Sequence, residues 1–370
     1  MKKMFFAAVA AALALAACTP AAKEFKLSGT GLPETLNGTY AKFYDMDQNV
    51  KDSVLIENGT FNYVAPANDT VVSTLVLGES SMVLSNEEGD FTLTYTTDEA
   101  TGAANLRCDG DANSSIMKAQ EMKGKIDELR ASLNAESEKI IAAIGEAEPT
   151  EEQMQQLSDL REKYSADSKD IYNSYYTKGG NKMIDWYAFM GLAGSWTPAE
   201  FVENFDAAGS LVKNDKDLAK MYVTMQAAAR TDVGQQFLDY ELVNPAGETK
   251  MLSEFRAEGK YFLLDFFASW CGPCKMSMPV IAEIEKEFAN VLTSASIAVW
   301  EQDADGTAYA QAVKDMNITW PTFQDSKSDA ATLYGLMGVP TFILVSPEGE
   351  ILMRGHDIKA VQTKLRELNK

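Results

Sequence analysis

The chain has 370 residues, of which 46% are hydrophobic and 24% charged, a composition typical of soluble globular proteins with two or three domains. Its 54 acidic and 33 basic residues give a net charge of -21 at pH 7, the wrong sign for binding nucleic-acid phosphates, so no nucleic-acid partner is expected. The single histidine, His356, argues against a His-rich metal site or a Ser-His-Asp triad, and we predict no metal and a surface or turn position for this residue.

The chain begins with the pattern of a secretion signal. Two lysines precede an apolar stretch that is too short to cross a bilayer as a helix, and residues 1–17 are predicted to be a signal peptide. The stretch ends in Leu-Ala-Ala before Cys18, which resembles the bacterial lipobox, whose cysteine is acylated after cleavage. The resemblance implies a lipoprotein of a Gram-negative cell envelope, anchored through Cys18, with a linker over 18–24, and facing the periplasm.

The residue after the cysteine bears on which membrane holds this anchor. Thr19 is not the aspartate that resembles an inner-membrane retention signal, so the outer membrane is favoured. The alternative is a secreted protein in which Cys18 has no role.

Residues 25–115 carry short runs in which hydrophobic and polar residues alternate, separated by turn-forming pairs such as Asn37-Gly38. Alternation with a period of two is typical of half-buried strands, and we predict an N-terminal antiparallel β-sandwich. The segment resembles a β-domain of unknown function that precedes thioredoxin domains in envelope lipoproteins. Cys108 is predicted to be a buried, inert thiol; the alternative is a mixed or intermolecular disulfide.

Helical patterns replace the strand patterns in residues 116–236. Hydrophobic residues recur three, four or seven apart, which predicts two long helices in a hairpin, the second beginning after Thr150 at a capping box. A third helix is expected after Thr197 and a fourth over about 215–230. The hydrophobic stripes predict an internal core, and the alternative is that they form a homodimer or bind a partner.

The residues expected to carry chemistry lie in 237–370. The apolar run 261–268 predicts a strand buried on both faces, and the motif Trp270-Cys271-Gly272-Pro273-Cys274 follows it directly, ahead of a helical pattern. A C-x-x-C pair at such a junction indicates a redox site, because no second Cys or His pair exists to complete the four ligands of a zinc site.

This strand, motif and helix, with Gly338-Val339-Pro340-Thr341 before another apolar strand, resemble the thioredoxin fold and, more narrowly, the TlpA/ResA-like thiol-disulfide oxidoreductases. The resemblance implies a C-terminal α/β thioredoxin-like domain over 237–370. It also implies an enzyme whose redox group is the Cys271–Cys274 disulfide and which needs no cofactor. The peroxidatic Thr-x-x-Cys of peroxiredoxins is absent from the motif, which argues against peroxidase activity.

Each residue of the motif has an expected task. Cys271 should lie at a helix N-terminus, where free N–H groups and the helix dipole favour a thiolate, so it is the predicted nucleophile. Cys274, one turn later, is expected to resolve the mixed disulfide. By the resemblance, Pro340 is the family's cis-proline, which holds a substrate strand opposite Cys271. The neighbours expected to contact substrate are Trp270, Gly272, Pro273, Val339 and Thr341.

Asp265 is the one charged residue in the apolar strand, six residues before Cys271, and matches the buried acid of thioredoxins. Burial would raise its pKa and let it accept the proton of Cys274 during resolution. The alternative is a polar residue at the end of the strand. Ser277 stands where several cytochrome-maturation relatives carry a glutamate, which argues against a role specific to apocytochromes.

Together these features predict a periplasmic thiol-disulfide oxidoreductase that reduces disulfides in envelope proteins. A membrane thiol electron donor is expected to reduce it in turn, because the periplasm has no reducing buffer of its own. One alternative is a disulfide isomerase or oxidase that dimerises through the helical region. Another is a binding lipoprotein in which the redox role is vestigial.

Overall fold

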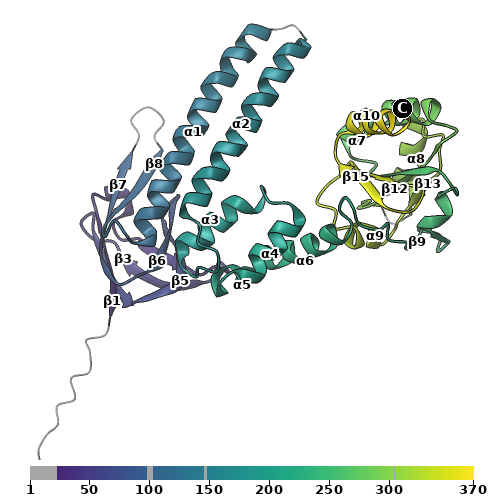
Figure 1. Cartoon of the computed structure of the whole chain (residues 1–370). Helices are drawn as coiled ribbons and strands as arrows, with labels where there is room; N and C mark the ends of the chain where they lie inside the picture. Colours follow the sequence, from purple (N-terminus) through teal and green to yellow (C-terminus); the bar gives the residue numbers. More distant parts are fainter. Residues whose placement is uncertain (1–22, 98–102, 146–147, 304) are drawn as a thin grey trace, which may run out of the picture. The chain divides into compact units, whose positions relative to one another are not determined.

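The computed structural model describes residues 23–97, 103–145, 148–303 and 305–370, which form two compact units (Figure 1). The first unit contains the residues up to 124 together with 182–184, and the second contains 125–181 and 185–370. The predicted signal peptide, 1–17, and the lipidation site Cys18 lie outside the described residues. No helix in the described ranges is both long and apolar enough to cross a bilayer.

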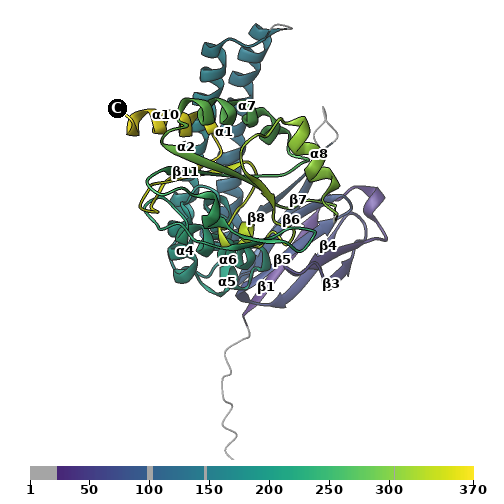
Figure 2. The same ribbon diagram turned by 90° about the vertical axis from the view of Figure 1, so that its right-hand side faces the viewer.

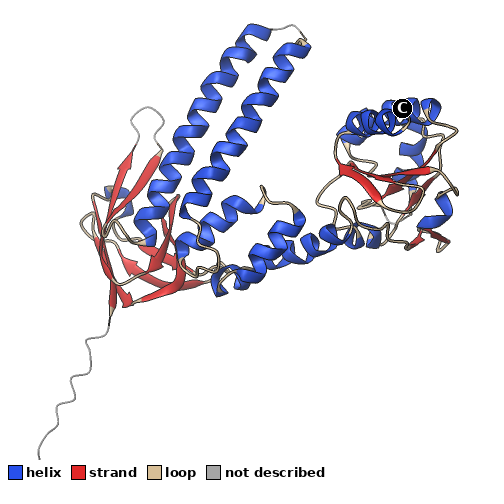
Figure 3. Ribbon diagram, in the orientation of Figure 1, coloured by secondary structure: helices blue, strands red, loops and turns tan. Residues whose placement is uncertain are grey.

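The strands of the first unit form two four-stranded sheets (Figure 3). One sheet has the order β4-β1-β7-β8 and consists of β1 (Glu24–Thr30), β4 (Phe61–Pro66), β7 (Gly89–Thr97) and β8 (Ala104–Asp109). The other has the order β3-β2-β5-β6 and consists of β2 (Tyr40–Tyr44), β3 (Val50–Leu55), β5 (Asn68–Leu77) and β6 (Ser80–Asn86), with the 3-10 turn η1 (Glu34–Leu36) before it. Alternation along β1 buries Phe25 and Leu27 completely.

The prediction of a wholly antiparallel β-domain is wrong for one pair of strands. β1 and β7 run parallel, with Phe25 opposite Gly89, whereas the other strand pairs described in this unit are antiparallel. Five strands separate β1 from β7 in the sequence, so no hairpin turn fixes their relative direction. Phe43 of one sheet stacks on Tyr63 of the other with ring centroids 3.9 Å apart. The packing of the two sheets as a sandwich stays a prediction.

Cys108 is a free cysteine on β8, fully buried in the first unit. The side-chain amide of Gln120 bonds both backbone polar groups of this residue, each at 2.6 Å, and so fixes the strand end against the start of α1 (Ser115–Ile144). Burial raises the pKa of the thiol to about 12, the negative charge of Asp109 adds to the rise, and a hydrogen bond with the Asp109 backbone opposes it. The buried thiol predicted from the sequence is therefore confirmed.

Cys108 is expected to resist alkylation in the folded protein. At pH 8 a thiol whose pKa is about 12 is ionised in only about one molecule in ten thousand, and the thiolate is the reactive form. After iodoacetamide treatment, mass spectrometry should find the peptide containing Cys108 unmodified in the folded protein and fully alkylated after unfolding in urea. Labelling in the folded state at the rate of an exposed thiol would contradict the expectation.

The helical prediction for residues 116–236 is confirmed in outline. α1 and α2 (Glu151–Tyr175) lie side by side in both views (Figures 1 and 2). α2 begins at the predicted capping box: the Thr150 hydroxyl accepts a hydrogen bond from the Gln153 backbone N–H at 3.2 Å, and the Thr150 N–H donates to the Gln153 side chain at 2.9 Å. Two orphan donors of the first turn are thereby satisfied.

The hairpin does not form the internal core expected from its hydrophobic stripes. In its described residues beyond Ile126, the only buried side chain is Ser168, and Met154 of the second stripe is 54% exposed. Two helices packed against each other cover only one side of each stripe, so its side chains stay half-exposed. Partner binding through these helices, the alternative, stays a prediction.

Four shorter helices follow: α3 (Met183–Ala193), α4 (Pro198–Ala207), α5 (Ser210–Asn214) and α6 (Lys216–Arg230). α4 starts at Thr197 and α6 after Asp215, both as predicted. α3 was not predicted from the sequence, because it is apolar on most sides and has no amphipathic period to detect. Its side chain Phe189 packs with Phe201 and Phe205 of α4 in an apolar cluster of the second unit.

The C-terminal part contains a five-stranded sheet in the order β13-β12-β11-β14-β15. β11 (Tyr261–Phe267), β12 (Leu292–Ala298) and β13 (Thr322–Gln324) run parallel, and β14 (Thr341–Val345) and β15 (Ile351–Gly355) continue the sheet with antiparallel pairing. The helices are α7 (Gly272–Glu287), α8 (Thr307–Asp315), α9 (Asp329–Leu333) and α10 (Ile358–Leu368). A short hairpin of β9 (Glu241–Val243) and β10 (Thr249–Met251) and the 3-10 turn η2 (Leu252–Phe255) precede the sheet.

β11 is buried on both faces, as its apolar sequence predicts. Leu263 and Phe267 point toward α7 and α10, where they join the apolar cluster that contains both cysteines of the motif. Phe262, Leu264 and Phe266 point to the opposite face, toward α9. Because side chains alternate along a strand, Asp265 shares the face of Leu263 and Phe267.

A half-buried arginine joins the end of α6 to this sheet. Arg354 of β15 donates to the hydroxyl of Thr231 at 2.6 Å and to its carbonyl at 3.2 Å. The same guanidinium donates to the carbonyls of Tyr334 at 2.7 Å and Gly335 at 3.1 Å. Gly335 has φ +57° and lies so close to α6 that a Cβ would collide with the backbone of Ala228.

Arg354→Gln is expected to lower the free energy of unfolding by about 3 kcal/mol, because it leaves buried carbonyls without the donors that now satisfy them. Urea denaturation measures this change. Arg366→Gln is the matched control: the exposed guanidinium of Arg366 pairs with Glu287 at 2.7 Å on the surface, where an ion pair contributes little. Equal losses in the two variants would refute the structural importance of Arg354.

Candidate active site

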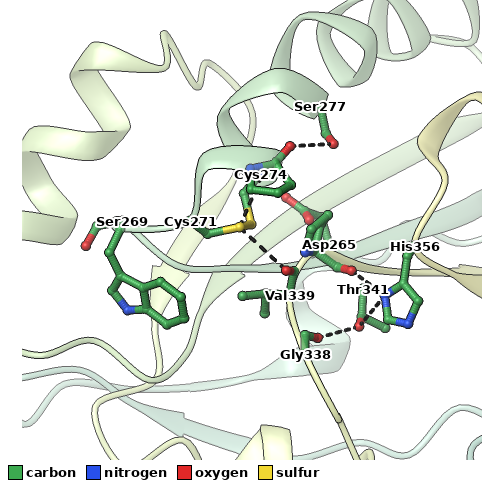
Figure 4. Close-up of a disulfide and its surroundings, with 12 residues drawn as sticks. Asp265, Ser269, Cys271, Cys274, Ser277, Gly338, Val339, Thr341 and His356 are labelled. Atoms are coloured by element: carbon green, nitrogen blue, oxygen red, sulfur yellow. Dashed lines mark hydrogen bonds between the residues drawn. A yellow bond between two sulfur atoms is a disulfide. The ribbon is translucent and has the colours of Figure 1, made fainter. Parts of the chain in front are cut away.

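The two cysteines of the motif are joined by a disulfide, with the sulfur atoms 2.05 Å apart, at the start of α7 (Figure 4). Cys271 is the N-cap residue, and its Sγ accepts a hydrogen bond from the backbone N–H of Cys274 at 3.1 Å. Cys274 is completely buried, whereas Cys271 retains 3% exposure. Of the two residues, only Cys271 therefore has any surface open to solvent.

The start of α7 favours negative charge on the Cys271 sulfur. The first N–H groups of a helix lack carbonyl partners and point toward its N-cap, and the helix dipole adds a partial positive charge there. Pro273 lies in the first turn, where its missing N–H and fixed φ cost nothing. Gly272 has no atom within 4 Å of where a Cβ would stand, so space does not require glycine at this position.

A loop with a cis peptide bond lies opposite Cys271. The Val339–Pro340 bond is cis, and the Val339 carbonyl oxygen lies 3.6 Å from the Cys271 sulfur (Figure 4). Thr341 is 2% exposed, and its hydroxyl donates a hydrogen bond to the Gly338 carbonyl at 2.8 Å. This bond helps to hold the conformation of the loop. Sequence positions 271 and 340 are thus brought together by the pairing of β11 with β14.

His356 contacts the same loop. It is exposed at the end of β15, as the predicted surface position requires, and its Nδ1 lies 2.6 Å from the Pro340 carbonyl oxygen (Figure 4). The pairing of Gly355 with Phe342 carries the histidine to the start of β14. This contact was missed from the sequence, where no pattern links a residue after the last strand to the proline.

A second loop supports the other side of the motif. Glu301 accepts hydrogen bonds from the backbone N–H of Ser269 at 2.7 Å and from its hydroxyl. The indole N–H of Trp270 donates to the Trp300 carbonyl at 3.0 Å, while half of the Trp270 side chain (51%) is exposed. Trp270 therefore presents a fixed apolar surface beside the disulfide. Glu301 was also missed, because the loop that holds it carries no motif.

Asp265 lies in the middle of β11 and is 1% exposed, so the alternative of a polar residue at the end of the strand is wrong. Its Oδ2 accepts a hydrogen bond from the Ser296 hydroxyl at 2.7 Å, and its Oδ1 has no partner. Burial raises the pKa of this carboxyl to about 7, and the Ser296 hydrogen bond opposes the rise. The group can thus hold or release a proton near neutral pH.

An open groove of about 420 Å³ runs beside the cis-proline loop. Its lining includes Pro273, Met276, Val280, Val339, Pro340 and His356. Two of the predicted substrate contacts, Pro273 and Val339, therefore share one surface with the proline. Among the described residues, no group of three or more His, Cys, Asp or Glu side chains could hold a metal ion.

Two cysteines one turn apart at a helix N-terminus, facing a cis-proline on a five-stranded sheet, define a thioredoxin-like redox domain. The sequence model of the AhpC/TSA family matches residues 233–354. The chain is 30% identical over 118 residues to the thioredoxin-like protein YneN of Bacillus subtilis, covering 32% of this chain and 68% of that protein. It is 29% identical over 148 residues to the thiol-disulfide oxidoreductase ResA of Oceanobacillus iheyensis, covering 38% and 69%.

A solved thiol-disulfide oxidoreductase from Bacteroides fragilis is 30% identical and covers 36% of this chain and 99% of its own, with a TM-score of 0.33. The chain belongs to the thioredoxin-like thiol-disulfide oxidoreductases, the family that its motifs resemble. It is accordingly an enzyme that exchanges thiols and disulfides.

Proposed function

We propose that the protein reduces disulfides in proteins of the cell envelope. The observation that carries the proposal is the position of the Cys271 sulfur, at the N-terminus of α7 and 3.6 Å from the Val339 carbonyl of the cis-proline loop. In the reduced enzyme the Cys271 thiolate attacks a substrate disulfide. A Cys271–substrate disulfide forms, and one substrate sulfur leaves as a thiolate.

Cys274 then resolves this mixed disulfide. Its thiol gives a proton to the Asp265 carboxylate, and the resulting thiolate attacks the Cys271 sulfur. The Cys271–Cys274 disulfide forms, the bond to the substrate breaks, and the second substrate sulfur leaves. The substrate has gained two electrons and the enzyme has lost them, with no cofactor taking part.

The cis-proline loop and the groove beside it are the proposed substrate contact. Main-chain groups of Val339 and Pro340 would pair with an extended substrate segment, as peptides add to exposed backbone edges elsewhere. Pro273 lines the same groove from the motif side. Trp270 and Gly272, its neighbours in the motif, are proposed to contact the substrate next to it. Thr341 contributes by orienting the loop, since its side chain is buried.

The proposed location is the periplasmic side of a Gram-negative envelope, with a lipid anchor on Cys18 in the outer membrane. Support comes from the lipobox-like sequence before Cys18. Acyl chains on this cysteine suffice for stable anchoring when two or three are attached. A membrane thiol electron donor would return the enzyme to its reduced form, because the compartment lacks a reducing buffer.

The reduction potential of the Cys271–Cys274 pair tests the direction of the reaction. The protein is equilibrated with defined thiol-disulfide buffers, and the reduced fraction is measured. A value near or below about -250 mV supports a reductase, since thioredoxin itself lies at about -270 mV. A value of about -120 to -180 mV, the range of oxidants and isomerases, would refute it.

The runner-up is a disulfide isomerase or oxidase that dimerises through the helical region. The half-exposed hydrophobic stripes of α1 and α2 are the observation that favours it. Sedimentation equilibrium separates the two functions when read beside the potential. A monomer with a low potential supports the reductase, and a dimer with a high potential supports the alternative.

A further inference from the structure

Three buried side chains form a hydrogen-bonded chain that ends on the carboxyl of the active site. The indole N–H of Trp320 donates to the Ser296 hydroxyl oxygen at 2.8 Å, and that hydroxyl donates to Oδ2 of Asp265 at 2.7 Å. Chemistry fixes which group donates in each of these hydrogen bonds, because an indole N–H can only donate. The single proton of the hydroxyl is then left for Asp265.

The sheet holds this chain in place. The pairing of β11 with β12 sets Ser296 directly beside Asp265, and the Ser296 N–H donates to the carbonyl of Pro321, the residue after Trp320. Trp320 itself packs in the apolar cluster that contains both cysteines. Ser296 is thus held from two sides, and it alone contacts Oδ2 of Asp265.

The other oxygen is left without a partner. Oδ1 of Asp265 is buried and makes no hydrogen bond. Figure 4 shows Asp265 on the Cys274 side of the disulfide, and alternation along β11 places it on the face that α7 covers. A buried oxygen without a partner, on the face of β11 that α7 covers, is free to receive the proton of a thiol on α7.

We propose that Ser296 and Trp320 are positioning residues for the resolving step, which hold Oδ2 of Asp265 so that Oδ1 accepts the proton of Cys274. The inference rests on the proposed function. The S–H bond of Cys274 breaks as an O–H bond forms on Oδ1. The new thiolate attacks the Cys271 sulfur and displaces the substrate sulfur.

The hydroxyl also controls how readily the carboxyl ionises. The residues paired with Asp265 across the sheet are Ser296 of β12 and Phe342 of β14, and no charged side chain of the described residues contributes to the shift of its pKa. From α7, Cys274 joins the apolar cluster on the same face of the sheet, and it is a thiol in the reduced enzyme. Burial raises the pKa of Asp265, and the Ser296 hydrogen bond is the one cause that lowers it. Removing that bond should leave a carboxyl that keeps its proton to higher pH.

The experiment compares Ser296→Ala and Trp320→Phe with the unaltered protein. The Asp265 carboxyl is titrated by 13C NMR in the oxidised form, and the decay of a Cys271 mixed disulfide with a model disulfide peptide is followed across pH. In Ser296→Ala we expect the carboxyl to titrate at higher pH and resolution at pH 7 to slow roughly 5- to 50-fold, recovering as pH rises. Trp320→Phe should shift the carboxyl titration and the rate of resolution in the same directions, because the Ser296 hydroxyl proton is no longer directed to Asp265.

Two further variants make the result specific. Ser294→Ala removes a buried hydroxyl from the same face of β12, one that has no hydrogen-bond partner, and should change neither readout. Ser296→Thr keeps the hydroxyl and should retain most of the rate. The proposal is overturned if Ser296→Ala and Trp320→Phe leave the carboxyl titration unchanged, if Ser294→Ala shifts it equally, or if the titration moves while the pH profile of resolution does not.

Failure of the proposed function would look different. If the unaltered protein forms no Cys271 mixed disulfide, or forms one that Cys274 does not resolve, the reductase mechanism is wrong and the positioning role falls with it. The carboxyl titrations then still tell whether Ser296 and Trp320 control Asp265. The two failures are therefore separable in one set of samples.

Discussion

Asp265→Asn is expected to remove most of the loss of stability that the oxidised protein suffers between pH 5 and pH 8. The carboxyl ionises at about pH 7 in the folded chain, against an ordinary value of 3.8, because burial disfavours its charge. Below pH 3.8 both states are protonated and the contribution to stability is fully present. As pH rises through 7 it is lost, since the folded state must either keep a proton or bury a charge.

The size of this effect follows from linkage. Between pH 5 and pH 8 the unaltered protein should lose about 3 kcal/mol relative to Asp265→Asn, which carries no titrating group at this position. Urea denaturation at the two pH values measures the difference, and the comparison cancels any fixed cost of the buried amide. Asp170→Asn, on the exposed side of α2, should behave like the unaltered protein. Parallel pH dependence in the unaltered protein and Asp265→Asn would contradict the assigned burial.

Replacing either active-site cysteine by serine should have opposite effects on the mixed disulfide with substrate: one variant should trap it and the other should not form it. Cys274→Ser keeps the nucleophile and removes the resolving thiol, so a substrate protein should stay attached to Cys271 through a disulfide. Cys271→Ser removes the nucleophile and should lower turnover on the order of a thousandfold or more, with nothing trapped. The reason is structural: Cys271 retains 3% exposure whereas Cys274 is completely buried, and Cys271 alone caps α7.

Non-reducing gels after acid quenching separate these products, and mass spectrometry locates the cross-link. Cys108→Ala is the control, because its sulfur is fully buried in the other unit and should affect neither trapping nor turnover. Trapping by Cys271→Ser, or none by Cys274→Ser, would reverse the assigned roles of the two cysteines.

The residues of this site that the sequence predicts are those that lie close together in the chain. The apolar strand with Asp265 at its centre leads directly into Cys271 and Cys274, so local periodicity and the motif place all three. Pro340 was found through the resemblance, and the structure places it opposite the cysteines.

The residues that sequence did not predict depend on strand register. Ser296 reaches Asp265 only because β12 pairs with β11 in one register, and His356 reaches Pro340 only because β15 pairs with β14. Each is an ordinary polar residue in its own segment, with no pattern around it. The parallel pairing of β1 with β7 was missed for the same reason, since neither strand carries information about its distant neighbour.

The hydrogen bonds of Arg354, at the edge of the sheet, determine where a stable fragment that contains the redox domain can begin. A fragment that starts at residue 237 would contain Arg354 but not Thr231, and two of the four hydrogen bonds of the guanidinium would have no acceptor. The surface of Tyr334 and Gly335 that α6 now covers would be open to water. A fragment that begins before Lys216 retains the whole of α6. In that fragment the edge of the sheet keeps its native contacts with the helix.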